Sequence, residues 1–206
     1  MKLYYSPGAC SIGIHVLLNE IGKPFEASKL DLAARKQFEP EFTSVNPKSK
    51  VPTLVRDDGS VLTEFPAIAT WLALSNPDKK LLPGDAEGMA RTLEALDYAV
   101  ATVHMQGFSR LFRPANFSPN EADHDGVKAR GREMIEKAFA IIDEKLKGKE
   151  YVSGAFSIAD CALFYVEFWA ARMKIAMPAN VAAHFERMKA RPAVQRTLAA
   201  EGLAAA

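Results

Sequence analysis

The sequence contains few cysteines, no excess of charge of either sign and no long apolar run. Its 206 residues include 26 Lys+Arg and 25 Asp+Glu. Without a strong field of one sign, a dedicated nucleic-acid binder is not expected. The apolar stretch at the N-terminus ends at Tyr5, too short for a secretory signal, and no stretch approaches the roughly 18 residues of a membrane span. We therefore expect no nucleic-acid or membrane partner, and a small ligand.

The cysteines, Cys10 and Cys161, are too few for a disulfide framework and do not stand at the spacing of metal ligands. This usage is typical of a reducing compartment, and we expect a cytoplasmic protein with both thiols free. The sequence also lacks the HExxH, GxSxG, Walker and GxGxxG patterns. A metal site and a Ser-His-Asp hydrolase are therefore disfavoured.

A break in composition divides the chain near residue 80. The stretch Asn76–Asp85 holds two prolines and a glycine, which is typical of a linker. Before it, short apolar segments alternate with turn residues, and Asp57-Asp58-Gly59 is a strong hairpin signal. We predict strands at 2–5, 25–32, 52–56 and 60–62, a helix that ends at Gly22 and another helix around 67–72. An α/β domain over residues 1–78 is therefore expected.

After the linker the strand signals disappear and helical periodicity takes over. Ser157-Ile-Ala-Asp160 resembles a capping box and predicts the start of a helix. Further helices are predicted over 87–111, 121–146, 181–190 and 193–201. We therefore expect an all-helical domain over residues 86–206.

The segment from Ser6 to Ser11 joins the first predicted strand to the first predicted helix. Ligands tend to bind at the carboxyl end of such a strand, and a helix N-terminus favours negative charge. The thiol of Cys10 should therefore have a lowered pKa. Gly13 stands where a dithiol would need its second cysteine, so Cys10 must act with one sulfur. The alternative is a half-buried cysteine beside a turn, and for Cys161 a core position is favoured.

Two further segments suit an anionic, peptide-like ligand. The residues leave open whether Val51-Pro52 forms a cis bond, which would offer a strand edge to another backbone, or a plain trans proline. Glu64 and Phe65 open the next helix, whose first amides suit a carboxylate. Glu64 itself either holds an amino group or offsets the helix dipole. Arg35 and Lys50 either supply positive charge or are simply solvated.

Taken together, these motifs resemble the bacterial beta-class glutathione transferases over essentially the full length. Several segments carry the resemblance in the right order, although any one alone would be weak. They are the opening 1–11, Asn46-Pro47-Lys48 with Val51-Pro52, Leu62-Thr63-Glu64 with Ala67-Ile68, Ser157–Asp160 with Leu163-Phe164, and Arg191-Pro192 with Glu201-Gly202-Leu203. The resemblance implies a thioredoxin-like N-terminal domain, an all-helical C-terminal domain, a homodimer, glutathione as co-substrate and no tightly bound cofactor.

The resemblance also implies how the thiol of glutathione would be activated. Cys10 would face the glutathione sulfur, and Ser11 is a rival thiolate donor because serine has that part in several related classes. His104 stands at or beside the active-site histidine of the helical domain. The thiolate is the nucleophile, so the implied function is transfer of glutathione to a small apolar electrophile.

Binding residues are implied in the same way. One set would hold glutathione: Arg35, Lys50, Val51, Pro52 in a cis peptide, Glu64 and the amide of Phe65. A second set would hold the electrophile: Phe108, Phe112 and Phe117. Such a site binds through a broad apolar surface rather than through specific polar contacts, so many electrophiles would fit.

Some positions depart from the beta-class pattern. Phe65 stands where that class has Gly, and its ring would crowd the pocket. Met105 replaces a lysine, and Gln106-Gly107 indicates a one-residue insertion, which would rotate His104 by about 100° on a regular helix. These departures keep two alternatives open: a glutathione-dependent thiol/disulfide reductase that uses Cys10, or a non-catalytic carrier of apolar ligands.

Overall fold

The computed structural model of the chain describes residues 1–203 and divides into two compact units. The first unit contains Met1–Leu82 and resumes at Lys189, whereas the second contains Pro83–Met188. The boundary at Leu82 falls inside the predicted linker. The expected second domain, 86–206, differs from this division, because the last helix, α9 (Pro192–Ala200), packs with the first unit.

The first unit is built on a mixed four-stranded sheet with the strand order β2-β1-β3-β4. Strand β1 runs parallel to β2 and antiparallel to β3, and β3 forms the predicted hairpin with β4. Leu3, in β1, pairs with Ala27 and Leu54 and is fully buried. The strands are β1 (Lys2–Tyr5), β2 (Glu26–Lys29), β3 (Thr53–Val55) and β4 (Val61–Thr63). The predicted α/β architecture is confirmed, with a second strand shorter than expected.

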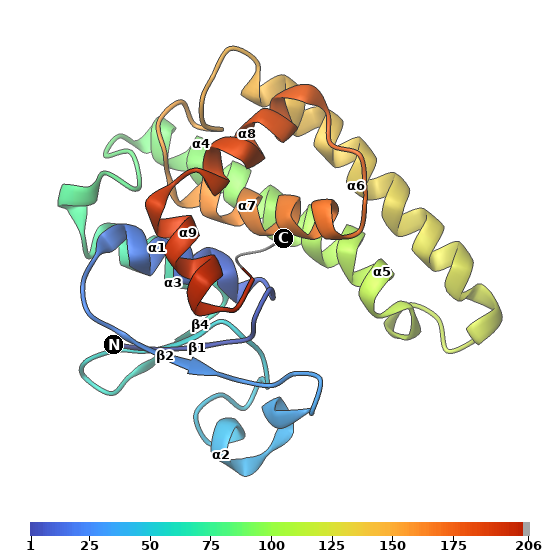
Figure 1. Cartoon of the computed structure of the whole chain (residues 1–206), viewed down its shortest axis with the longest axis horizontal. Helices are drawn as coiled ribbons and strands as arrows, with labels where there is room; N and C mark the ends of the chain where they lie inside the picture. Colours follow the sequence, from blue (N-terminus) through green and yellow to red (C-terminus); the bar gives the residue numbers. More distant parts are fainter. Residues whose placement is uncertain (204–206) are drawn as a thin grey trace. The chain divides into compact units, whose positions relative to one another are not determined.

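Helix α1 (Ser11–Ile21) packs against α3 (Phe65–Leu74) and α9. The N–H of Gly22, which has a φ of 76°, ends α1 by donating to the Leu18 carbonyl. Glycine suits this left-handed position, so the predicted helix end is confirmed. Figure 1 shows α9 beside α1, although the two helices come from opposite ends of the chain. A single turn, α2 (Pro40–Thr43), lies between β2 and β3.

The second unit is built from helices. The predicted helix over 87–111 is one helical stretch, but its middle is wound as a π-helix, η3 (Tyr98–Phe108). Hydrogen bonds in a π-helix run from i to i+5, as from the Ser109 N–H to the His104 carbonyl. The other helices are α4 (Ala86–Asp97), α5 (Ser109–Phe112), α6 (His124–Leu146), α7 (Ile158–Arg172) and α8 (Ala179–Lys189). Within residues 1–203, no helix combines the length and apolar character needed to cross a membrane.

Close packing of η3 on α6 accounts for the glycine in this π-helix. A Cβ at Gly107 would lie 2.6 Å from Cγ1 of Ile135, and a Cβ at Gly131 would lie 2.8 Å from the Gly107 carbonyl oxygen. Both distances are shorter than a real side chain allows, so each position requires glycine for close approach. The insertion indicated at Gln106-Gly107 therefore coincides with wider helical turns, and the rotation expected on a regular helix does not apply to η3.

The predicted capping box at the start of α7 is confirmed. Oγ of Ser157 accepts the N–H of Ala159 at 3.3 Å, and Oδ2 of Asp160 accepts the Ser157 N–H at 2.8 Å. Oδ1 of Asp160 accepts a further N–H, from Val152, at 2.9 Å. The shorter Asp side chain thus completes the box and also fixes the turn that precedes α7.

Asp160 belongs to a buried ionisable cluster in the second unit. His184 contacts Asp160 through Nε2 at 3.1 Å and Glu167 through Nδ1 at 2.8 Å. All three side chains are fully buried. Burial alone would lower the pKa of His184, but the two carboxylates outweigh it and raise this pKa to about 10. The cluster joins α7 to α8 inside the helical core.

Candidate functional site

Cys10 lies where β1 gives way to α1, as the sequence predicts. It is the N-cap residue of α1, it is half-buried, and its thiol donates to the carbonyl of Val51 at 3.4 Å. The Val51-Pro52 peptide is cis, the alternative that the resemblance implied. Two segments about 40 residues apart in the chain are thus brought together at a helix N-terminus, where the macrodipole favours negative charge.

Ser11, the residue after Cys10, is fully buried. Its Oγ accepts the N–H of Ser6 at 3.1 Å and donates to the Ser6 carbonyl at 3.3 Å. The hydroxyl therefore closes the loop between β1 and α1. This geometry gives Ser11 a bracing contact inside the loop and offers none of its surface to a substrate thiol.

The loop before Val51 is held by a residue to which the sequence assigned no role. Asn46 is 1% exposed, and its Nδ2 donates to the Lys50 carbonyl at 2.9 Å and to Oγ1 of Thr53 at 2.8 Å. Its Oδ1 accepts the N–H of Lys48 at 3.0 Å. Asn46 thus holds the backbone before Val51 and the side chain of Thr53 after it. The Asn46-Pro47-Lys48 motif was the available signal, because asparagine often bonds the backbone of a nearby turn.

Glu64 is the N-cap residue of α3 and adopts a φ of 71° and a ψ of 125°. A residue other than glycine in such a sparsely populated region costs about 1–3 kcal/mol, and such strain gathers at functional sites. The Glu64 carboxylate is largely exposed and pairs with Nζ of Lys48 at 2.8 Å. The backbone of α3 thus begins in a strained turn that presents a carboxylate beside the first amides of a helix.

The remaining expected glutathione contacts are distributed unevenly. Phe65 is 5% exposed, so its ring lies in the interior of the first unit rather than in an open pocket. Arg35, with a φ of 60°, stacks its guanidinium over the ring of Phe38 at 5.0 Å. Arg35 and Lys50 are exposed, and within the described part of the chain neither forms an ion pair. Both charges are therefore accessible to an anionic ligand.

In the second unit, His104, Phe108 and Phe112 all contact Trp169 of α7. Phe108 is fully buried, contrary to the expected electrophile site, whereas Phe112 is exposed. The rings of Phe108 and Phe112 stack at 5.8 Å, and both contact Trp169, at 5.3 and 5.1 Å. His104 lies 4.7 Å from the Trp169 ring, and its Nδ1 lies 3.3 Å from the hydroxyl of Tyr165. We call these five residues the aromatic cluster.

Two members of the aromatic cluster, Tyr165 and Trp169, were missed in the sequence. Their spacing of four residues puts them on one face of α7, and this was the available signal. Phe117 contacts Arg110 instead, with its ring 4.2 Å from the guanidinium. The expected electrophile set is therefore only partly assembled within this unit.

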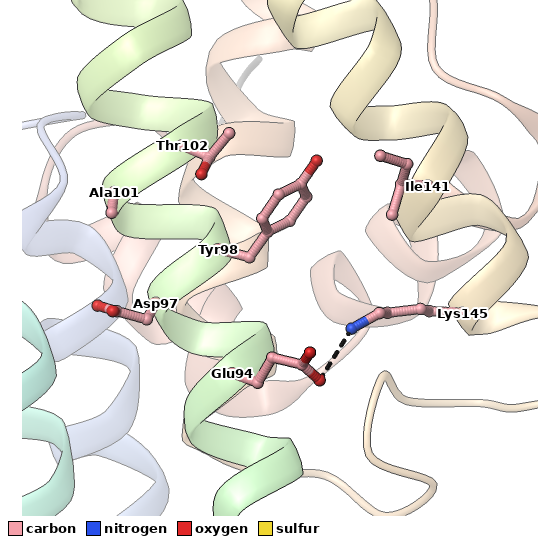
Figure 2. A pocket seen from close by; sticks show the side chains of 7 residues that line it. All are labelled: Glu94, Asp97, Tyr98, Ala101, Thr102, Ile141 and Lys145. Atoms are coloured by element: carbon pink, nitrogen blue, oxygen red, sulfur yellow. Dashed lines mark hydrogen bonds and ion pairs between the residues drawn. The ribbon is translucent and has the colours of Figure 1, made fainter.

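A groove of about 470 Å³ opens elsewhere in the second unit, between the α4–η3 stretch and α6 (Figure 2). Figure 2 shows Lys145 and Glu94 extending toward each other across it, with Nζ 3.1 Å from Oε2. The hydrogen bond from Lys145 lowers the pKa of Glu94. None of the predicted site residues lines this groove. Its lining is Glu94, Asp97, Tyr98, Ala101, Thr102, Ile141 and Lys145.

Both parts of the chain match protein-family models. Residues 8–74 match the model described as glutathione S-transferase, N-terminal domain. Residues 125–196 match the model described as glutathione S-transferase, C-terminal domain. The two matches cover the loop that carries Cys10, the cis Val51-Pro52 peptide and the capping box.

Individual relatives agree over nearly the full length. Glutathione S-transferase GstA of Escherichia coli O157:H7 is 41% identical over 209 residues, covering 98% of this chain and 100% of the relative. A sphingomonad glutathione S-transferase, solved with glutathione, is 38% identical, with a TM-score of 0.86 over 98% of this chain and 100% of that one. The bacterial beta-class enzyme of Sphingomonas chungbukensis is 36% identical, with a TM-score of 0.84 over the same shares.

Proposed function

This chain belongs to the glutathione S-transferase family, and from that premise we propose that it transfers glutathione to small apolar electrophiles. The observation that carries the proposal is the contact between the Cys10 thiol and the Val51 carbonyl at the N-terminus of α1. It supports a site in which the Cys10 sulfur and the backbone of Val51 meet. A relative solved with glutathione supports the choice of this tripeptide.

Each part of glutathione has a counterpart in the first unit. The backbone of Val51 pairs with the cysteinyl residue, and Glu64 with the amino group of the γ-glutamyl residue. The first amide N–H groups of α3, beginning at Phe65, donate to the neighbouring carboxylate, because a helix N-terminus binds anions. The exposed charges of Arg35 and Lys50 attract the glycine carboxylate.

The chemical step needs the thiolate of glutathione. At the N-terminus of α1 the macrodipole stabilises this anion, so its proton leaves to solvent. The sulfur lone pair then forms a bond to the electrophilic carbon. For an aryl chloride, chloride leaves with the electrons of the bond that breaks. Ser11 braces the loop, and Phe112, the exposed ring of the aromatic cluster, supplies apolar surface for the second substrate.

Activity and binding test the proposal together. We expect conjugation of glutathione to 1-chloro-2,4-dinitrobenzene, measured by absorbance, and heat of binding when glutathione is titrated into the protein. Without heat at millimolar glutathione and without conjugation, both enzymatic functions fail and the carrier alternative is favoured. Binding of an apolar dye under those conditions would support that carrier.

The second candidate is a glutathione-dependent reductase, favoured by the half-buried thiol of Cys10. The Cys10 thiolate would attack the glutathione sulfur of a mixed disulfide and release the other thiol. A second glutathione would then free Cys10 and leave as glutathione disulfide. Cys10→Ala separates the functions: loss of disulfide reduction with retained conjugation would show that Cys10 serves reduction only.

We also propose a homodimer, with the long helices of the second unit as its contact. The partly exposed side chain of Ile141, 42% accessible on α6 beside the groove, supports this choice. Sedimentation of the wild type and of Ile141→Asp tests it, because a charge at a dimer face should shift the equilibrium to monomers. A wild-type monomer would refute the homodimer. The cytoplasmic location stays a prediction.

A further inference from the structure

Glu201 follows α9 and is buried, although the proposed function does not use it. Its side chain is 0% exposed, and a carboxylate withdrawn from water must be matched by donors. Oε1 lies 2.8 Å from Nδ1 of His15, and Oε2 accepts the N–H of Gly8 at 2.8 Å. Because an ionised carboxylate only accepts, Nδ1 of His15 carries the proton of the first bond. Glu201 thus joins α1 to the loop that precedes it.

Gly8 stands two residues before Cys10 and has a φ of 70°, which favours glycine. The loop also has bonds of its own: the N–H of Ala9 donates to the Ser6 carbonyl at 3.0 Å, and Ser11 bonds to Ser6. These bonds close the loop on itself. The bond from Gly8 to Glu201 instead ties the loop to another element, and a bond to a charged acceptor is roughly twice as strong as a neutral one.

Other contacts hold α9 on α1 without reaching the loop. Nδ2 of Asn19 donates to Oγ1 of Thr197 at 2.8 Å. Nε of Arg191 lies 2.6 Å from Oε1 of Glu20. Docking of α9 therefore rests on several contacts along the helix, and the Glu201 contact extends to the residues beside Cys10.

We propose that Glu201 is a positioning residue for the transferase site. Held by His15, it fixes the Gly8 peptide and thereby sets where the Cys10 thiol lies against the Val51 carbonyl. The inference rests on the proposed function, because it takes this loop as the place where glutathione binds. Glu201 acts through the backbone and touches neither substrate nor reacting atoms.

The test compares Glu201→Ala with Glu201→Gln, which keeps an acceptor oxygen. Thr197→Val is the matched control, since it removes the Asn19 bond between the same helices and leaves the loop untouched. Two quantities are measured: the dissociation constant of glutathione by calorimetry, and the rate at which iodoacetamide alkylates Cys10 between pH 5 and 10, quantified by mass spectrometry. Cys161 is 0% exposed, so alkylation of the folded protein reports on Cys10.

We expect Glu201→Ala to raise the dissociation constant about tenfold and to change the alkylation rate at pH 7 by at least about threefold. Glu201→Gln should stay within about threefold of the wild type for both quantities. Thr197→Val should lower the unfolding midpoint and leave both quantities unchanged. If Glu201 had a purely structural role, the dissociation constant and the alkylation rate would change in both Glu201→Ala and Thr197→Val, or in neither. Either result would overturn the proposal.

A second pair of variants covers the case in which Glu201→Ala does not fold. His15→Asn keeps an N–H near the position of Nδ1, whereas His15→Leu removes it. Only His15→Leu should change the alkylation profile, and equal profiles would refute the proposal. Because alkylation needs no glutathione, a wild type that fails to bind glutathione would refute the proposed function while this comparison still decides the role of Glu201.

Discussion

Each compact unit buries a histidine against carboxylate oxygens, but the two arrangements serve different parts of the molecule. In the first unit His15 meets one carboxylate, that of Glu201, whose other oxygen binds the loop before Cys10. In the second unit His184 lies between Glu167 and Asp160, inside the helical core. Burial of an ionisable group does not by itself mark a functional site, and the proposed role of Glu201 rests on its contact with the loop before Cys10.

The arrangement in the second unit is explained by structure alone. Asp160 completes the capping box of α7, accepts the N–H of Val152 and meets His184, so one carboxylate serves three elements. The charges of such a cluster stabilise one another only while all members are present. When a buried histidine is removed, we therefore expect the loss of unfolding free energy to grow with the unpaired carboxylate charge that is left behind.

The largest effect should come from His184→Ala. It leaves the carboxylates of Glu167 and Asp160 facing each other without a cation, and we expect a loss of about 5 kcal/mol of unfolding free energy. Urea unfolding followed by circular dichroism measures this loss. His124→Ala, at a partly buried helix start, is the control and should lose less than about 1 kcal/mol. Equal losses would contradict the role assigned to the cluster.

His15→Ala should destabilise the protein less, by about 3 kcal/mol. It leaves one buried carboxylate, Glu201, which keeps the N–H of Gly8 as a partner. The same urea experiment measures the effect. If His15→Ala costs more than His184→Ala, the ranking by unpaired charge is wrong.

The pH dependence of stability separates the clusters further. The folded pKa of His184, about 10, lies above its ordinary value of 6.5, so the folded state holds this proton more tightly. The resulting stability is complete below about pH 6.5 and is lost as the pH rises through about 10. Between pH 7 and 9 we expect a decline of about 2–3 kcal/mol, because both pH values lie largely between the two pKa values. In His184→Ala this decline should be absent; the same slope in both proteins would point to other groups.

The smallest effect should come from Ser157→Ala, which removes the cap of α7 and costs about 1 kcal/mol. A double variant with His184→Ala tests whether cap and cluster act as one unit, because Asp160 belongs to both. We expect a coupling of at least about 0.5 kcal/mol in urea unfolding. Strict additivity would show that the capping box is independent of His184.

Local patterns predicted much of the fold. The apolar face of α1, the glycine at its end, the hairpin around Gly59 and the capping box at Ser157 are all short-range signals, and each corresponds to the structure. The π-helix was not predicted, because its winding coincides with the close approach of Gly107 to α6, a contact between segments far apart in sequence. The return of α9 to the first unit was missed for the same reason.

The proposed site shows the same contrast between residues marked by local patterns and residues held by contacts between distant segments. Cys10 and Glu64 stand at element boundaries that turn residues reveal, so the sequence located both. The bond between His15 and Glu201 joins residues 186 positions apart, and neither residue belongs to a local motif with a known chemistry. Patterns within single segments therefore indicate candidate ligand contacts more readily than the distant residues that hold them in place.

A crystal structure of the protein soaked with glutathione would show whether the turn between β1 and α1 is the glutathione site. We expect the tripeptide sulfur in van der Waals contact with Sγ of Cys10, and its cysteinyl backbone paired with Val51 beside the cis proline. Glutathione bound elsewhere in the molecule, with the turn between β1 and α1 empty, would contradict the assignment of that turn as the glutathione site.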